Sequence, residues 1–293
     1  NESLDGVSIP QAGIALIDGT APHVVDPRNP GAVDEIINLG DFWDEEGIKK
    51  NKDFILKCGK DIKKSFERAY RYLKSAKCLY DDMEEINILA LREEKAKNII
   101  LSLVDEIFSG KERHNNKSNE RCLFASAITP DGLINYIPSL LNNIEKVYVI
   151  KAECAMPVGQ VLERVRREAL EMGYDVELFY CAFNPKKLEH VIIPGISTAV
   201  LTSNEFHSVD VDKCKEIDFR EYENISIHKM YEDVLNFDNA EFNSLLNQAV
   251  KTISQAKKIH DRLEEFYIPH MNFEEMQKNY NDTVQKILKC IGK

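Results

Sequence analysis

Several features that would assign the chain to a well-defined class are absent from its sequence. The phosphate-binding pattern G-x-x-x-x-G-K-[ST] occurs nowhere in the 293 residues. No apolar run approaches the roughly 20 residues that span a bilayer, and the first residues lack the charged-then-apolar layout of a signal peptide. The seven cysteines form no C-x-x-C pair and no Cys/His spacing suited to zinc. We therefore expect a reduced, cytoplasmic protein that contacts no membrane and has no metal site of its own.

An excess of positive charge is also missing. The chain carries 38 Lys and Arg against 49 Asp and Glu, for a formal net charge of −11. Nucleic-acid binding needs clustered basic side chains, whereas here they are interleaved with acids along the helices. We expect a solvated acidic surface and no nucleic-acid partner.

An internal repeat organises the chain. LDGVSIPQAGIALIDGTAPHVVD (4–26) aligns with LEHVIIPGISTAVLTSNEFHSVD (188–210) at an offset of 184, with eight identities. The apolar stripe of a long helix over 62–83 recurs over 242–263 at an offset of 180. These similarities predict two tandem repeats, 1–111 and 112–293. The first lacks a counterpart of 112–184, so we expect residues to be missing upstream of Asn1.

The second repeat alternates strands with helices. We predict strands over 122–129, 146–151, 175–181 and 198–203, a turn at 130–132, and helices over 133–144 and 158–172. This alternation predicts an α/β fold with a mainly parallel sheet covered on both faces. After its last strand, each repeat is expected to continue into an antiparallel helical hairpin, inserted beside the sheet.

Residues 147–181 have the strand, turn, helix and strand layout of a P-loop unit. Together with DGTAPHVVDPRNPGAVDEIINLGD (18–41), MGYDVELFYC (172–181) and HVIIP (190–194), this layout resembles a bacterial family of predicted ATPases with two tandem P-loop NTPase domains. The resemblance covers essentially the whole chain. It implies a P-loop NTPase-like fold, ATP and Mg²⁺ as ligands of the intact protein, and an ATPase or small-molecule kinase activity.

The family's phosphate cradle maps onto residues 152–160. Its glycines, lysine and hydroxyl residues are replaced by Ala152, Ala155, Pro157, Val158, Gly159 and Gln160. Pro157 also removes a backbone N–H, and Glu153 adds negative charge where a phosphate would lie. The mapping therefore implies a degenerate P-loop, with no nucleotide bound by 112–293.

In the first repeat, the resemblance places Asp18 at a Walker B-type position, where a carboxylate holds the water shell of Mg²⁺. The second repeat has Thr202 there. The alternative is that Asp18 and Gly19 form only a turn with an Asx hydrogen bond. Thr20, His23 and Arg28 are candidates for contacting nucleotide or substrate, although for Arg28 an ordinary surface position is the favoured alternative.

His23 and His207 are the clearest polar pair shared by the two repeats. Each could contact a phosphate, or could hold the loop that leads into the helices. His207 persists where the cradle has been lost, which favours the structural role for the pair.

Two functions are consistent with these patterns. In the first, the intact protein is an ATPase or small-molecule kinase whose working cradle lies upstream, with repeat A able to bind nucleotide. In the second, the chain is a pseudo-NTPase scaffold that binds a partner through its helices. In either case the sheet of the first repeat would have an open edge, which an upstream fragment or another subunit would need to complete.

Overall fold

The computed structural model describes residues 4–20, 24–115, 117–211 and 213–291. The chain divides into two compact units, one comprising residues up to 59 together with those from 260 onward, the other residues 60–259. These units are defined by packing, whereas the 111/112 boundary is defined by sequence similarity, so the two repeats remain a prediction. No helix in the described ranges combines the length and apolar character needed to cross a bilayer.

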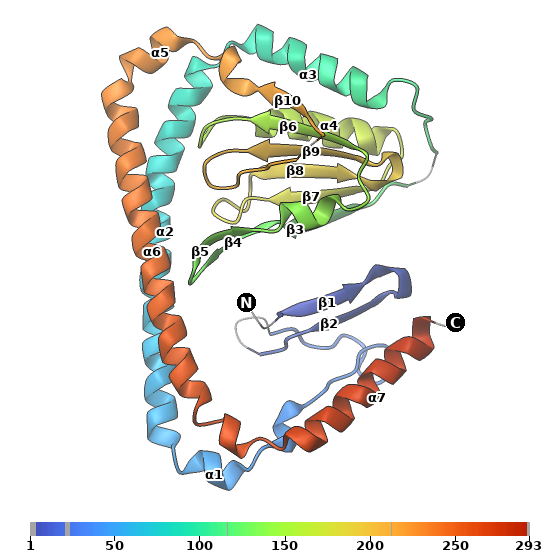
Figure 1. Cartoon of the computed structure of the whole chain (residues 1–293), viewed down its shortest axis with the longest axis vertical. Coiled ribbons are helices and arrows are strands. Elements are labelled where there is room, and N and C mark those ends of the chain that lie inside the picture. Colours follow the sequence, from blue (N-terminus) through green and yellow to red (C-terminus); the bar gives the residue numbers. More distant parts are fainter. Residues whose placement is uncertain (1–3, 21–23, 116, 212, 292–293) are drawn as a thin grey trace. The chain divides into compact units, whose positions relative to one another are not determined.

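A six-stranded sheet forms the centre of the 60–259 unit (Figure 1). Its spatial order is β10 (Lys215–Asp218), β6 (Lys146–Lys151), β9 (Thr198–Ser203), β8 (Leu188–Ile193), β7 (Val176–Tyr180) and β3 (Glu120–Phe124). Only β8 is antiparallel to its neighbours. The predicted α/β class with a mainly parallel sheet is therefore confirmed.

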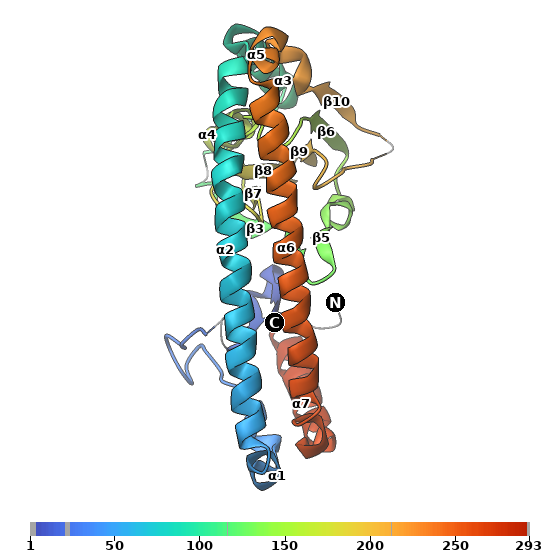
Figure 2. The ribbon, with the colours of Figure 1, turned by 90° about the vertical axis from the view of Figure 1, so that its left-hand side faces the viewer.

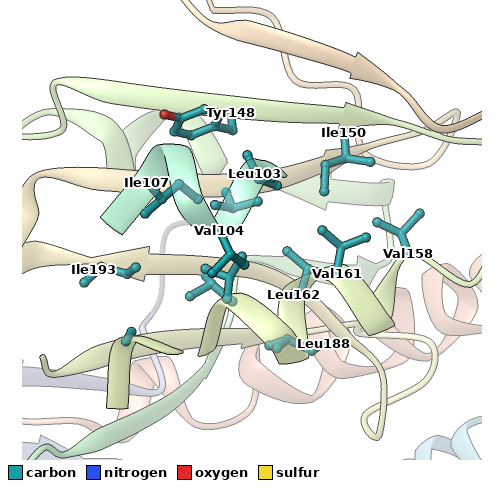
Figure 3. Close-up of a cluster of buried hydrophobic side chains, with 14 of the residues drawn as sticks. Leu103, Val104, Ile107, Tyr148, Ile150, Val158, Val161, Leu162, Leu188 and Ile193 are labelled. Carbon is teal, nitrogen blue, oxygen red and sulfur yellow. The ribbon is translucent and has the colours of Figure 1, made fainter. Parts of the chain in front are cut away.

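The two faces of the sheet are buried differently. Tyr148 and Ile150 of β6 point to a core formed with α3 (Glu93–Phe108) and α4 (Gly159–Glu171), as Figure 3 shows. Val147 and Val149 of the same strand point to a second core, closed by the 3₁₀ helix η3 (Ile137–Leu141) and a loop. Because successive strand residues alternate between faces, the apolar run of β6 supplies both cores. Burial of each such aliphatic side chain stabilises the folded state by roughly 1.5–3 kcal/mol.

The segment before β6 differs from the prediction in two ways. Residues 122–129 are divided between β3 and β4 (Ser126–Thr129), and the helix predicted over 133–144 is wrong. β5 (Gly132–Asn135) instead folds back antiparallel on β4, and η3 follows. The reason is the turn, in which Gly132 adopts φ 112° and its carbonyl accepts a hydrogen bond from the Thr129 hydroxyl at 2.8 Å.

Two long helices, α2 (Lys52–Ala90) and α6 (Glu232–Glu264), lie side by side (Figure 2). In the 60–259 unit their stripes meet where Ala76, Tyr80 and Met83 pack against Phe242 and Leu246. The predicted hairpin is therefore wrong for the first repeat. The helix after α2 is α3, which packs instead on α4 and the sheet, because its own apolar stripe is buried there.

The other unit contains a smaller set of elements. In chain order they are β1 (Gly6–Ile9), η1 (Pro10–Ala12), β2 (Ile14–Ile17), η2 (Leu39–Phe42), α1 (Glu45–Lys49), η6 (Ile268–His270) and α7 (Phe273–Ile291). β1 and β2 form an antiparallel pair in which Ile9 lies opposite Ile14. In β8 and β9, Ile193 lies opposite Thr198, so the register is the same at an offset of 184.

The offset of 180 residues between the predicted repeats also relates two backbone hydrogen bonds. The N–H of Arg92 donates to the Tyr222 carbonyl at 2.8 Å, and that of Asn272 donates to the Phe42 carbonyl at 2.9 Å. As a result, α3 starts beside η5 (Phe219–Tyr222), whereas α7 starts beside η2. The last helix of each predicted repeat thus packs in the unit that holds the strand pair of the other.

Candidate functional site

The carboxyl ends of β6 and β9 carry the polar residues that would form a site. This is where ligands bind in open α/β sheets. A groove of 680 Å³ lies there, between the turn after β6 and helices α2, α6 and α5 (Ile225–Met230). Its charged residues include Lys151, Glu153, Glu205, Arg220, Lys229 and Glu232. Acids and bases are balanced in this set, unlike the positive surround that a polyphosphate requires.

Residues 152–158, which connect β6 to α4, offer few free donors to an anion. The N–H groups of Ala152, Glu153, Met156 and Val158 donate within the chain, to Ser203 O, Met156 Sδ, Glu153 O and Met156 O. Pro157 has no N–H. Five of these seven positions therefore have no backbone donor available for a phosphate, whereas a phosphate cradle depends on such donors.

Apolar side chains of this turn are packed into the cores around it. Ala155, Met156 and Val158 are almost fully buried, and Ala155 adopts a left-handed φ of 61°. Burial of these side chains offsets the cost of that backbone conformation. Met156 and Val158 belong to the core formed with α3 and α4, and Ala155 belongs to the cluster between α2 and α6, so the connection is held by packing on both sides.

Lys187 approaches the turn from the loop before β8. Its ammonium donates to the Met156 carbonyl at 3.0 Å, pairs with Glu84 at 2.9 Å, and contacts the Tyr80 hydroxyl. Its side chain is only 15% exposed. This lysine holds the turn to α2, so its charge is neutralised inside the protein.

The carboxyl groups of Glu153, Glu205 and Glu223 lie near one another at this turn. Burial, followed by the charge of Glu153, raises the pKa of Glu205 and raises that of Glu223 to about 7. Both shifts show that negative charge is already unfavourable here. An added phosphate would meet the same repulsion.

A buried cluster of Glu189, His190, Thr202 and His207 lies behind the turn. The Thr202 hydroxyl lies 3.0 Å from Nε2 of His207, and the Thr202 N–H donates to Nδ1 of His190 at 3.2 Å. Glu189 Oε1 is 3.8 Å from the other ring nitrogen of His207. Burial is the main cause that lowers the pKa of both histidines, so both are neutral at pH 7.

A β-bulge brings this cluster together. Phe179 of β7 lies opposite His190 and Tyr180 lies opposite Leu188, so Glu189 is the extra residue. The carboxylate of Glu189 and the imidazole of His190 consequently reach the same place, within 4.8 Å of each other and of His207. Bulges re-aim side chains in this way.

Two histidines and one carboxylate resemble a metal-ligand set. However, Nδ1 of His190 accepts a hydrogen bond, so in the neutral ring Nε2 carries the proton. A protonated nitrogen is a donor and not a ligand, and this buried Nε2 has no hydrogen-bond partner within the described residues. The site is therefore better suited to binding a group that accepts a hydrogen bond from His190 than to binding a cation.

The thiols nearby are poor nucleophiles. Burial raises the pKa of Cys154 and of Cys181 to about 12, so neither forms a thiolate at neutral pH. Both line a cavity of 70 Å³ that Thr202 and His207 also line. Its volume is enough for a few water molecules.

The residues predicted in the first repeat lie in the other unit. Oδ1 of Asp18 accepts hydrogen bonds from the N–H and the hydroxyl of Thr20, both at 2.8 Å. This is the Asx turn that was the alternative to a Mg²⁺ role. Arg28 is exposed in the following loop, and His23 lies outside the described residues. The structure therefore brings Asp18 together with Thr20.

Sequence reasoning missed Lys187, Glu189 and His190. The available signal was two ionisable residues inside the otherwise apolar run LEHVIIP, which is unusual for a strand buried on both faces. No protein-family model, curated protein or solved structure matches the chain.

Proposed function

We propose that the chain is a P-loop NTPase-related protein whose second half has lost nucleotide binding and acts as a pseudo-NTPase scaffold in the cytoplasm. The observation that carries the proposal is the closed turn at 152–158. Most of its backbone donors are used within the chain, Met156 and Val158 are buried in the core, and its lysine position is apolar. Mg·ATP would have to break this packing in order to bind.

Calorimetric titration of Mg·ATP into the full chain tests the proposal. We expect no binding heat and no rise in Tm at millimolar Mg·ATP. Nucleotide at 100 times its Kd would stabilise the folded chain by about 2.7 kcal/mol, a shift that is readily detected. Binding that survives Asp18→Ala and is strengthened by Glu153→Lys, which replaces a negative by a positive charge at the turn, would place nucleotide in the second half and contradict the proposal.

The second candidate is an ATPase or small-molecule kinase activity of the intact protein, with ATP and Mg²⁺ held through the first repeat. Asp18, Thr20 and Arg28 support it, as residues matching the family's motif after β2. Binding heat that is abolished by Asp18→Ala would favour this candidate. In that case the scaffold role would still apply to residues 112–293.

A further inference from the structure

The strand pair β8–β9 shows how the equivalent pair β1–β2 can be covered. β8 pairs antiparallel with β7 on one side, and β9 pairs parallel with β6 on the other. β1–β2 has the same register at an offset of 184. In the part of the chain that the structure describes, its two outer edges pair with no strand.

Equivalent side chains differ sharply in exposure. Val7 is 47% exposed and Ile17 is 58% exposed, whereas Val191 and Leu201 are both fully buried. These residues represent both faces of the strand pair, because Val191 belongs to the core beneath α3 and α4 and Leu201 to the opposite core. Both faces of β1–β2 therefore carry apolar side chains that are about half exposed.

The helix beside each pair shows the same contrast. α3 buries five apolar side chains, at Ala96, Leu103, Val104, Ile107 and Phe108, mainly against α4 and the sheet. α7 buries none. Its Leu288, the counterpart of Phe108 at an offset of 180, is 53% exposed. Among the described residues of its unit, α7 packs on η1 and η2 and not on a helix like α4.

We propose that β1–β2 is the docking surface for a strand–helix–strand segment built like residues 146–180. One strand adds parallel to β2, as β6 does to β9, and the other adds antiparallel to β1, as β7 does to β8. The helix between them covers Val7 and packs on α7. Main-chain hydrogen bonds supply the pairing, and apolar burial on both faces supplies the affinity. The proposal does not depend on whether that segment binds phosphate.

A chimaera with a second copy of residues 112–184 placed directly before residue 1 of the full chain tests this. Because residue 185 corresponds to residue 1, the added copy would lead into β1 through the same connection that joins β7 to β8 in the 60–259 unit. We expect hydrogen exchange of the β1 and β2 amides to slow by roughly 100-fold or more relative to the original chain. The amides of β8 and β9 provide an internal check that the chimaera is folded.

Two substitutions in the chimaera serve as a matched pair. Ile17→Lys places a charge in the docking surface and should remove the added protection, whereas Leu56→Lys, at a similarly exposed site on α2, should retain it. The proposal is overturned if β1 and β2 exchange as fast as in the original chain while β8 and β9 stay protected. It is also overturned if the original chain sediments as a dimer with β1 and β2 already protected, since a second copy would then be the occupant.

Discussion

The backbone N–H of Thr202 donates a hydrogen bond to Nδ1 of His190, and 3.2 Å separates the two nitrogens. Both residues are buried. His190→Leu would leave this N–H without an acceptor, at a cost of about 1–3 kcal/mol in the free energy of unfolding. His190→Asn places an amide oxygen near the position of Nδ1 and should recover part of the loss. Urea unfolding of the three proteins measures both effects, and equal losses in the two variants would contradict the hydrogen-bond role.

The same histidine predicts a pH dependence. Burial, with His207 nearby, holds the pKa of His190 well below its usual value. The unfolded chain therefore takes up the proton first, so the stabilisation present near pH 7 is lost as the pH falls below about 6.5. His190→Asn cannot titrate in this range. Between pH 7 and pH 5 the original chain should therefore lose more of its free energy of unfolding than His190→Asn does. A difference between the two proteins that does not change with pH would refute the assignment.

Glu223 should give stability the opposite dependence on pH. Burial raises its pKa to about 7, and Glu153 adds to the shift. A carboxyl whose folded pKa is raised costs stability once it ionises, so the cost is full above pH 7 and disappears as the pH falls towards 4.5. Glu223→Gln should raise Tm above pH 7 and give little gain near pH 5. Glu221→Gln, on the exposed side of η5, is the control and should change Tm little at either pH.

Lys187 links the turn after β6 to α2. Lys187→Met removes its bonds to Glu84, Tyr80 and Met156, and we expect a loss of about 2 kcal/mol or more, because bonds to a charged group are the stronger ones. Lys186→Met, at the exposed neighbouring residue, should be nearly neutral. Denaturant unfolding compares the pair. Similar losses for both would mean that the observed contacts of Lys187 do not contribute to stability.

Phe242 is the centre of the contact between α6 and α2. Its ring packs on Tyr80, Phe183 and Phe206, with centroids 5.1–6.1 Å apart. Phe242→Ala should cost about 3–5 kcal/mol, because it leaves a cavity in this cluster. Phe237→Ala on the same helix removes a ring that is 62% exposed and should cost far less. A small effect of Phe242→Ala would indicate that the two helices are not held together here.

The sequence pattern predicted a turn between a strand and a helix at 152–158, and the structure has β6 and α4 on either side of it. That this turn is a degenerate phosphate cradle stays a prediction, made from the residue types at Ala152, Pro157 and Val158. The burial of Met156 in the core and the contacts by which Lys187 ties the turn to α2 depend on residues distant in sequence. Such contacts leave no periodic signal.

The strands at 146–151 and 198–203, the helix that begins near 159 and the stripes of α2 and α6 follow from the sequence itself, because apolar periodicity is a local property. The reversed strand β8, the bulge at Glu189, the β4–β5 hairpin and the pairing of α2 with α6 were decided only by tertiary structure. Each depends on which distant segment supplies hydrogen bonds or apolar cover, and the same local pattern is compatible with several partners. Thus His190 could be read in the sequence as an unusual residue in a strand, whereas its bond to Thr202 required the fold.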